Sequence, residues 1–217
     1  MNLPDLFVQT LYGRLAWTAV ATALLLALLA RRQAVGPRAA VLVAVAVGAL
    51  MHLPGAWSPA HWLGLAFQRP SAFAAALCVL SVAGRLSPRP AAPVLPWPLA
   101  AVIVGAGAVL YLDASGWLAR GLYPMGFGAV GAPLAGLVLA TAAAAAWLTG
   151  RGAGQAVALV GATALFALWR LPTGNLWDAL VDPWLWVWGG GVLARRVARP
   201  RRRAREVPVA AEPATVL

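Results

Sequence analysis

The strongest candidate for chemistry is a polar triplet near the C-terminal end of the chain. Asn175, Asp178 and Asp182 follow one another at spacings of three and four residues. On a helix these spacings place the three side chains on one face. Two carboxylates one turn apart could bind a cation, relay a proton or divide the roles of acid and base. A ligand or proton site is therefore one interpretation of the triplet.

The second interpretation is that the same residues only cap helices. Asn175 is a good N-cap residue, and Asp178 three positions later completes a pattern like a capping box. Asp182 precedes Pro183, and proline is favoured at the first position of a helix. Negative charge at a helix start also suits the helix dipole. The sequence leaves both interpretations open.

Other charged residues extend the candidate site. Asp113 ends an apolar run, where it could pair with Arg120 or Arg170, or cap a short helix that follows it. His52 and His61 lack the spacing of a metal motif and the sequence has no phosphate-binding glycine loop, so we expect neither a metal nor a cofactor. The full candidate polar site comprises Asp113, Arg120, Arg170, Asn175, Asp178 and Asp182.

The chain has eleven tryptophans, and many of them lie close to these polar segments. Tryptophan forms belts at the interfaces between membrane and water. An aromatic surface can also stack against a sugar or receive a lipid tail. We expect an aromatic rim beside the polar site, formed by Trp117, Trp177 and Trp184.

The amino-acid composition predicts the class of fold that must position these residues. Of the 217 residues, 62% are hydrophobic and 11% are charged, and the mean hydropathy is +0.78. A soluble domain is about 45–50% apolar and about 25% charged. A chain this short cannot bury so much apolar surface in a water-soluble core, which excludes a soluble enzyme, a disordered chain and a disulfide scaffold. We predict an all-α, polytopic transmembrane helix bundle.

Seven apolar runs are the candidate spans, since a spanning helix needs about 20 mainly apolar residues. They cover residues 15–30, 39–53, 71–84, 97–112, 129–150, 154–169 and 183–194. The last run is short, so unless Arg195 and Arg196 snorkel far inward we expect its helix to begin earlier and to bring Asp182 to the membrane border. Short interfacial helices on the outer face are expected over residues 2–13, 58–68, 114–122 and 175–182.

The distribution of arginine predicts the orientation, because cytoplasmic loops carry an excess of basic residues. With the N-terminus outside, only Arg14, Arg69, Arg120 and Arg170 fall on the outer side, and the other arginines fall inside. We therefore predict a transmembrane domain over residues 1–194 and, over residues 195–217, a basic juxtamembrane segment with a disordered cytoplasmic tail. The residues expected to contact lipid headgroups are Arg195, Arg196, Arg199, Arg201, Arg202 and Arg203.

These features lead to three hypotheses about function. Arginine without lysine, with abundant alanine, glycine and proline, indicates a GC-rich bacterium. We expect a multi-pass inner-membrane protein that acts as an accessory or scaffold in a cell-envelope pathway. Its aromatic and acidic outer face would meet a lipid-linked molecule or another envelope membrane protein, with membrane lipids around it and no nucleic-acid partner.

The other two hypotheses concern transport and catalysis. A weak repeat, in which a short outer helix precedes a span, suggests a transporter or flippase for an amphipathic substrate. An outer-face aspartate acting as acid or base would instead make the protein a membrane enzyme. The residues alone leave open whether the protein is an enzyme.

Overall fold

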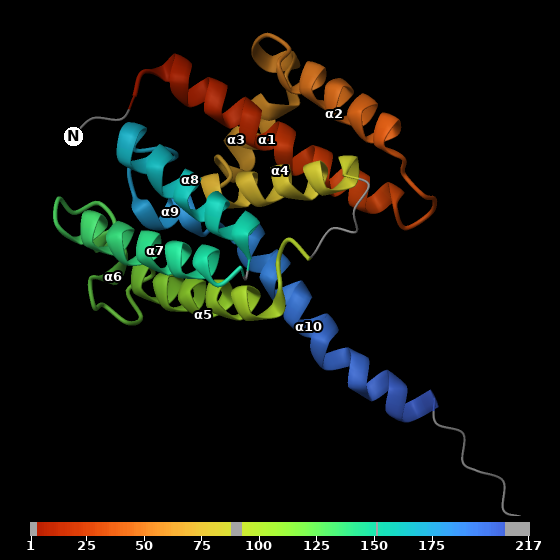
Figure 1. Ribbon diagram of the computed structural model, residues 1–217. Coiled ribbons are helices and arrows are strands. Elements are labelled where there is room, and N and C mark those ends of the chain that lie inside the picture. Colours follow the sequence, from red (N-terminus) through yellow and green to blue (C-terminus); the bar gives the residue numbers. More distant parts are fainter. Residues whose placement is uncertain (1–3, 88–92, 151, 207–217) are drawn as a thin grey trace, which may run out of the picture.

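The computed structural model describes residues 4–87, 93–150 and 152–206, with side chains up to residue 198. Within this part the chain forms ten α-helices and one 3-10 turn, and no strand (Figure 1). The prediction of an all-helical protein is therefore confirmed. Three of the helices, α1 (Leu6–Leu29), α5 (Trp97–Ala114) and α7 (Gly131–Leu148), are long and apolar enough to cross a membrane.

Seven of the helices match the seven predicted apolar runs in position. Besides α1, α5 and α7 they are α2 (Pro37–Met51), α4 (Ala72–Leu86), α8 (Ala153–Trp169) and α10 (Pro183–Glu206). The remaining elements are η1 (Gly55–Trp57), α3 (Pro59–Phe67), α6 (Leu122–Met125) and α9 (Leu176–Leu180). Proline lies in the first turn of several of these helices. Its fixed φ and missing N–H are tolerated there, whereas they would disrupt the interior of a helix.

The N-terminal helix starts earlier than predicted. Asp5 caps α1 by accepting a hydrogen bond from the Val8 N–H at 2.9 Å, so helical geometry begins at Leu6. The separate interfacial helix expected over residues 2–13 is therefore wrong, because the described part of that segment belongs to α1. Polar residues interrupt the apolar pattern here, but Arg14 is satisfied by donating to the Leu53 carbonyl at 3.2 Å.

Two further boundaries differ from the predictions. No helix covers residues 114–122: α5 runs on to Ala114, and α6 begins only at Leu122. The short apolar run suggested that the last helix begins before Pro183, but α10 begins at Pro183 itself. It gains length at its basic end and continues to Glu206, about 36 Å at 1.5 Å per residue. Residues 207–217 lie outside the described residues.

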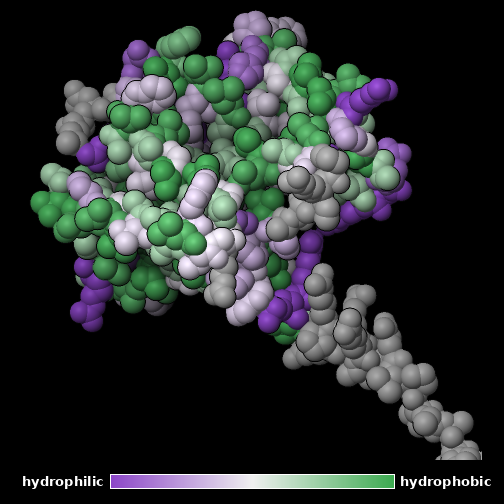
Figure 2. Space-filling view, in the orientation of Figure 1, coloured by the Kyte–Doolittle hydropathy of each residue, from purple (hydrophilic) through white to green (hydrophobic). Residues whose placement is uncertain are grey.

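The helices pack side by side into a bundle (Figure 1). Helix α1 packs against α2 and α4, α4 against α8, α8 against α7, and α5 against α10. The main core includes Phe73, Leu77, Ile103, Phe166, Leu176 and Leu185. A second buried cluster, formed by Trp17, Val47, Met51 and Ala60, lies between α1, α2 and α3. Hydrophobic residues also cover much of the face shown in Figure 2, and residues such as Leu42, Val102 and Leu137 are exposed. An apolar exterior of this extent suits a surface that faces lipid rather than water.

Close packing between α5 and α10 depends on glycine. A Cβ atom on Gly107 would lie 2.5 Å from Cδ1 of Trp186, and one on Gly189 would lie 3.0 Å from Cγ2 of Val104. The absence of a side chain at Gly107 leaves room for the Trp186 indole, which donates to the Val104 carbonyl at 2.9 Å. Small residues therefore permit close helix packing at these two positions.

Candidate functional site

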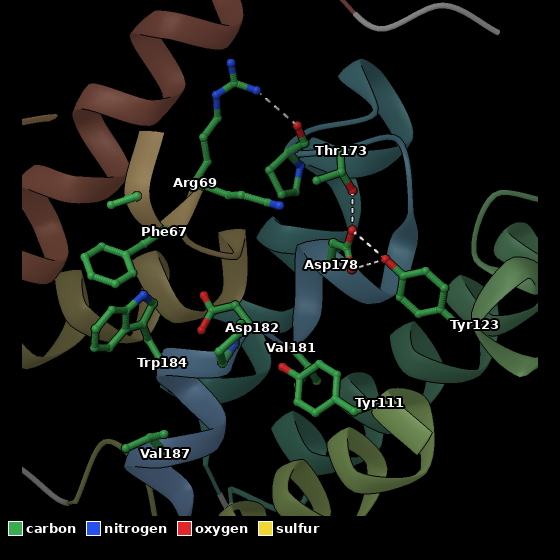
Figure 3. Close-up of a pocket in the computed structure, with 14 residues that line it drawn as sticks. Phe67, Arg69, Tyr111, Tyr123, Thr173, Asp178, Val181, Asp182, Trp184 and Val187 are labelled. Carbon is green, nitrogen blue, oxygen red and sulfur yellow. Dashed lines mark hydrogen bonds between the residues drawn. The ribbon is translucent and has the colours of Figure 1, made fainter. Parts of the chain in front are cut away.

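The site is a cavity of about 580 Å³ at the ends of several helices (Figure 3). Its walls come from the α3–α4 connection, the end of α5, α6, the loop between α8 and α9, α9 itself and the start of α10. The polar side chains in the lining are Gln68, Arg69, Tyr111, Tyr123, Thr173, Asp178 and Asp182. Phe67, Trp184 and Val187 are among the apolar ones.

Asp178 is held by two hydroxyl groups. Its carboxylate accepts hydrogen bonds from Tyr123 Oη at 3.0 and 3.1 Å and from Thr173 Oγ1 at 2.5 Å (Figure 3). The capping-box contact suggested by the sequence is not formed, because the Asn175 N–H donates to Thr173 Oγ1 at 3.3 Å instead. The Asp178 carboxylate therefore faces side chains of the cavity rather than the backbone of its own helix.

Asp182 joins two helix starts. Its Oδ1 accepts the Leu185 N–H at 2.7 Å, which makes it the predicted N-cap of α10. Its Oδ2 accepts the Ser71 N–H at 2.5 Å, and Ser71 in turn caps α4 through the Ala74 N–H at 3.1 Å. Only 7% of Asp182 is exposed. Asp182 thus serves as a cap and also as part of the cavity wall.

Asn175 is a cap but not a lining residue. Its Oδ1 accepts the Trp177 N–H at 3.0 Å, which confirms the prediction that it starts α9. Its Nδ2 donates to the Tyr123 carbonyl at 3.2 Å, and the side chain is fully buried. The missing side chain of Gly126 leaves the room for this arrangement, because a Cβ there would overlap Asn175 Oδ1.

Asp113 lies in the last turn of α5 and closes the loop that follows. Its carboxylate accepts the backbone N–H of Arg120 at 2.6 Å and that of Tyr123 at 2.8 Å. The expected cap of a helix beginning directly after Asp113 is wrong, since that stretch is a loop. Arg120 contacts Asp113 by donating its backbone N–H. Asp113 reaches the cavity only indirectly, through Tyr123.

The two arginines predicted for the polar site lie outside the cavity wall. Arg120 is exposed on the loop after α5. Arg170 ends α8 with a left-handed backbone, φ 54°, and its guanidinium lies 4.8 Å from the centre of the Phe166 ring. The structure thus brings Asp178 and Asp182 to one cavity and leaves Asp113, Arg120, Arg170 and Asn175 outside its lining.

The cationic group of the cavity is Arg69, which the sequence did not single out. Arg69 Nη1 donates to Gln9 Oε1 at 3.0 Å and to the Pro172 carbonyl at 3.5 Å. These contacts join α1, the α3–α4 connection and the loop before α9. Arg69 is more than one hundred positions from either aspartate, so no local spacing could associate them.

Two tyrosines supply hydroxyl groups that sequence reasoning also missed. The Tyr111 hydroxyl oxygen is buried and has no hydrogen-bond partner within the described part of the chain, although the residue lines the cavity. A buried polar group without a partner is costly, so this hydroxyl is free to bond to a ligand. Burial raises the pKa of Tyr123 to about 12, and the charge of Asp178 and their hydrogen bond add to the effect. Tyr123 therefore remains a neutral donor at physiological pH.

The predicted aromatic rim is only partly assembled around the cavity. Trp184 lines it and contacts Phe67 edge to face, with ring centres 5.0 Å apart. Trp177 instead donates its indole N–H to the Leu122 carbonyl at 2.9 Å. Trp117 is 83% exposed on the loop after α5. Of the three tryptophans, only Trp184 contributes to the cavity wall.

The basic segment lies on α10, far along the helix from Asp182. Arg195 and Arg196 are exposed, and the Arg196 guanidinium lies 4.1 Å from the centre of the Trp97 ring. The side chains of Arg199, Arg201, Arg202 and Arg203 lie outside the described residues. In the described part of the chain, no three His, Cys, Asp or Glu side chains are grouped as metal ligands would be.

No protein-family model matches the chain, and comparisons with characterised proteins and with solved structures find no match. The chemistry of the cavity therefore has to be argued from its own residues. It combines two carboxylates, one guanidinium and several hydroxyl groups with an aromatic and aliphatic wall. Such a lining suits a molecule with a charged or polar head and an apolar body.

Proposed function

We propose that the chain is a multi-pass protein of the bacterial inner membrane, with seven spans formed by α1, α2, α4, α5, α7, α8 and α10. The long apolar helices and the exposed apolar exterior support this. Helices α2, α4 and α8 have only 15, 15 and 17 residues. At 1.5 Å per residue they reach about 22–26 Å, so flanking residues or a locally thinner bilayer complete the span.

The orientation that we propose has the N-terminus outside and the C-terminus in the cytoplasm, because this places most arginines inside. Reporter fusions test it. Alkaline phosphatase joined after Trp117 should be active, and green fluorescent protein joined after Leu217 should fluoresce. An active phosphatase at the C-terminus would contradict the orientation and move the cavity to the cytoplasmic side.

We propose further that the protein is an accessory factor which binds the polar head of a lipid-like molecule in this cavity. The observation that carries this is the composition of the wall. Arg69, Asp178 and Asp182 meet there beside apolar residues that remain exposed: Phe67 is 51% exposed, Trp184 43% and Val187 61%. The charged part of the cavity therefore adjoins an apolar surface on which a lipid tail can lie, and a second envelope protein can receive the bound molecule.

The hydrogen bonds favour binding over acid–base catalysis. Both oxygens of Asp182 accept backbone N–H groups, and those of Asp178 accept two hydroxyl groups. Hydrogen bonds that fix both oxygens of a carboxylate also stabilise its charged form, so each group presents negative charge to a ligand and is a weaker proton acceptor. Transport of the lipid-like molecule and catalysis at the outer face stay as alternative hypotheses.

The test is to identify lipids that copurify with the protein in a mild detergent, by native mass spectrometry. Wild-type protein should retain a defined lipid, and Asp178→Asn and Trp184→Ala should lose most of it. Asp5→Asn is the matched control, because Asp5 is an exposed cap on α1 and is not part of the cavity wall. Wild-type protein without retained lipid, or equal retention in all variants, would contradict the proposal.

A further inference from the structure

A second cavity of about 510 Å³ adjoins the first. Its lining includes Arg14, His61 and Trp17, and it shares Gln68, Arg69, Pro172 and Thr173 with the first cavity. No aspartate or glutamate lines it, among the residues described. The two cavities therefore differ in charge: the first holds two carboxylates and one guanidinium, and the second holds two guanidinium groups and a histidine.

The two guanidinium groups of the second cavity are bonded only to neutral acceptors. Arg14 Nη2 donates to the Leu53 carbonyl at 3.2 Å, and Arg69 Nη1 donates to Gln9 and Pro172. Neither arginine has a carboxylate partner in the described part of the chain. Both residues are partly buried, and although Asp178 and Asp182 line the first cavity with Arg69, no ion pair joins them to it in the described residues, so each guanidinium lacks a direct counter-charge. An anion bound between them would supply that counter-charge.

The wall between the cavities is firmly placed. Gln68 has φ 61° and ψ −154°, a region that residues other than glycine rarely adopt. Its carbonyl accepts the indole N–H of the buried Trp17 at 3.1 Å. The Arg69 stem lies against α1 at Gly13, where a Cβ would meet Arg69 Cγ in ordinary van der Waals contact at 3.5 Å. Backbone strain held by such contacts is typical of sites where position matters.

We infer that the second cavity binds the phosphate group of the lipid-like ligand, an inference that rests on the proposed function. Guanidinium groups match phosphate in geometry and charge, and basic pockets between membrane helices bind phosphate-bearing headgroups. Asp178 and Asp182 repel an anion, so the phosphate lies on the Arg14 side of Gln68. The exposed side chain of Leu65 on α3, which lines the cavity, offers an apolar surface beside it.

Calorimetric titration of the full chain in detergent tests this inference. The probes are dioctanoyl phosphatidylglycerol, dioctanoylglycerol, which has the same chains without phosphate, and inorganic phosphate. We expect wild-type protein to bind the phospholipid at least tenfold more tightly than dioctanoylglycerol. Arg14→Gln should weaken phospholipid binding about tenfold, the factor expected for one charge-assisted hydrogen bond.

Two further variants make the result specific. Arg120→Gln removes the same charge from an exposed position outside both cavities and should leave binding unchanged. Arg69→Lys keeps the charge but loses the planar fork, and should weaken binding in protein whose helix content by circular dichroism is unchanged. Both variants should retain the elution volume of the wild type on size-exclusion chromatography.

The outcomes separate the inference from the proposed function. Equal binding of phospholipid and dioctanoylglycerol, or no effect of Arg14→Gln, would overturn the phosphate site and leave lipid binding intact. Binding of inorganic phosphate without either lipid, weakened by Arg14→Gln, would keep the anion site but overturn lipid binding. No binding of any probe would overturn both.

Discussion

Ser71 and Asp182, which are 111 positions apart, join the starts of two helices through a single hydrogen bond from the Ser71 N–H to Asp182 Oδ2. The same carboxylate caps α10 through its other oxygen. One side chain therefore fixes the relative position of α4 and α10 at the edge of the cavity. The stability of the bundle should depend on it more than on an ordinary cap.

Replacing Asp182 by alanine should destabilise the protein by about 2–4 kcal/mol, because two buried N–H groups lose their acceptor. Asp182→Asn keeps one oxygen acceptor and should cost less. Chemical unfolding in detergent, followed by helical circular dichroism, measures both. Asp5→Ala, which removes an exposed cap, should cost only about 1 kcal/mol, and equal losses at positions 5 and 182 would contradict the role given to Asp182.

Gly126→Ala should disrupt the contact between the α6–α7 loop and α9. The new Cβ would overlap Asn175 Oδ1, and the Leu176 N–H donates to the Gly126 carbonyl at 3.0 Å, so neither segment can easily move. We expect a loss of about 1–3 kcal/mol in the same unfolding assay. Gly105→Ala is the control: a Cβ at Gly105 meets no atom within 4 Å, so the change should be neutral or slightly stabilising.

Tyr123 should give the protein a distinct pH dependence at alkaline pH. Its pKa is raised to about 12, against about 10 in the unfolded chain, so the folded state favours the neutral phenol. The stability that this supplies is complete below pH 10 and is lost as the pH rises towards 12. Unfolding measured from pH 8 to 11.5 should show a steeper loss in wild type than in Tyr123→Phe.

Absorbance at 295 nm provides an independent reading of the same group, because it reports phenolate formation. The difference between the titrations of wild type and Tyr123→Phe isolates this tyrosine from Tyr12 and Tyr111. A difference curve with its midpoint near pH 10 in folded protein would contradict the buried hydrogen bond to Asp178.

Gln68→Gly should stabilise the protein, whereas Gln68→Ala should not. Glycine adopts φ 61° and ψ −154° without strain, and alanine has the same steric restriction as glutamine. The relief of about 1–3 kcal/mol is partly offset by the greater freedom of glycine in the unfolded chain, which leaves a gain of about 1 kcal/mol. Equal melting temperatures for the two variants would mean that residue 68 is not strained.

Local signals in the sequence predicted most of the helices and two of the caps. Apolar runs located seven helices to within a few residues at most ends, and Asn175 and Asp182 have the capping roles that their neighbours indicate. These features depend on contacts within one turn of the chain, where residue type and spacing decide the outcome. The start of α1 was missed because Gln9 and Arg14 interrupt its apolar pattern.

The cavity could not be predicted in the same way. Its charged residues come from segments more than one hundred positions apart, and its hydroxyl groups belong to tyrosines and a threonine that carry no spacing signal. Asp113, Arg120 and Arg170 all lie in segments predicted for the outer side, yet helix packing places them outside the cavity wall. Only the tertiary contacts decide which polar residues meet.

Tyr123 holds one aspartate with its main chain and another with its ring hydroxyl. The two attachments can change independently, since rotation about the Cα–Cβ bond moves the hydroxyl and leaves the peptide unit where it is. The Tyr123 hydroxyl can therefore leave Asp178, which Thr173 still holds, while the turn anchored on Asp113 stays closed. The hydrogen bonding of the Asp178 carboxylate can thus change while the backbone of the loop after α5 keeps its conformation.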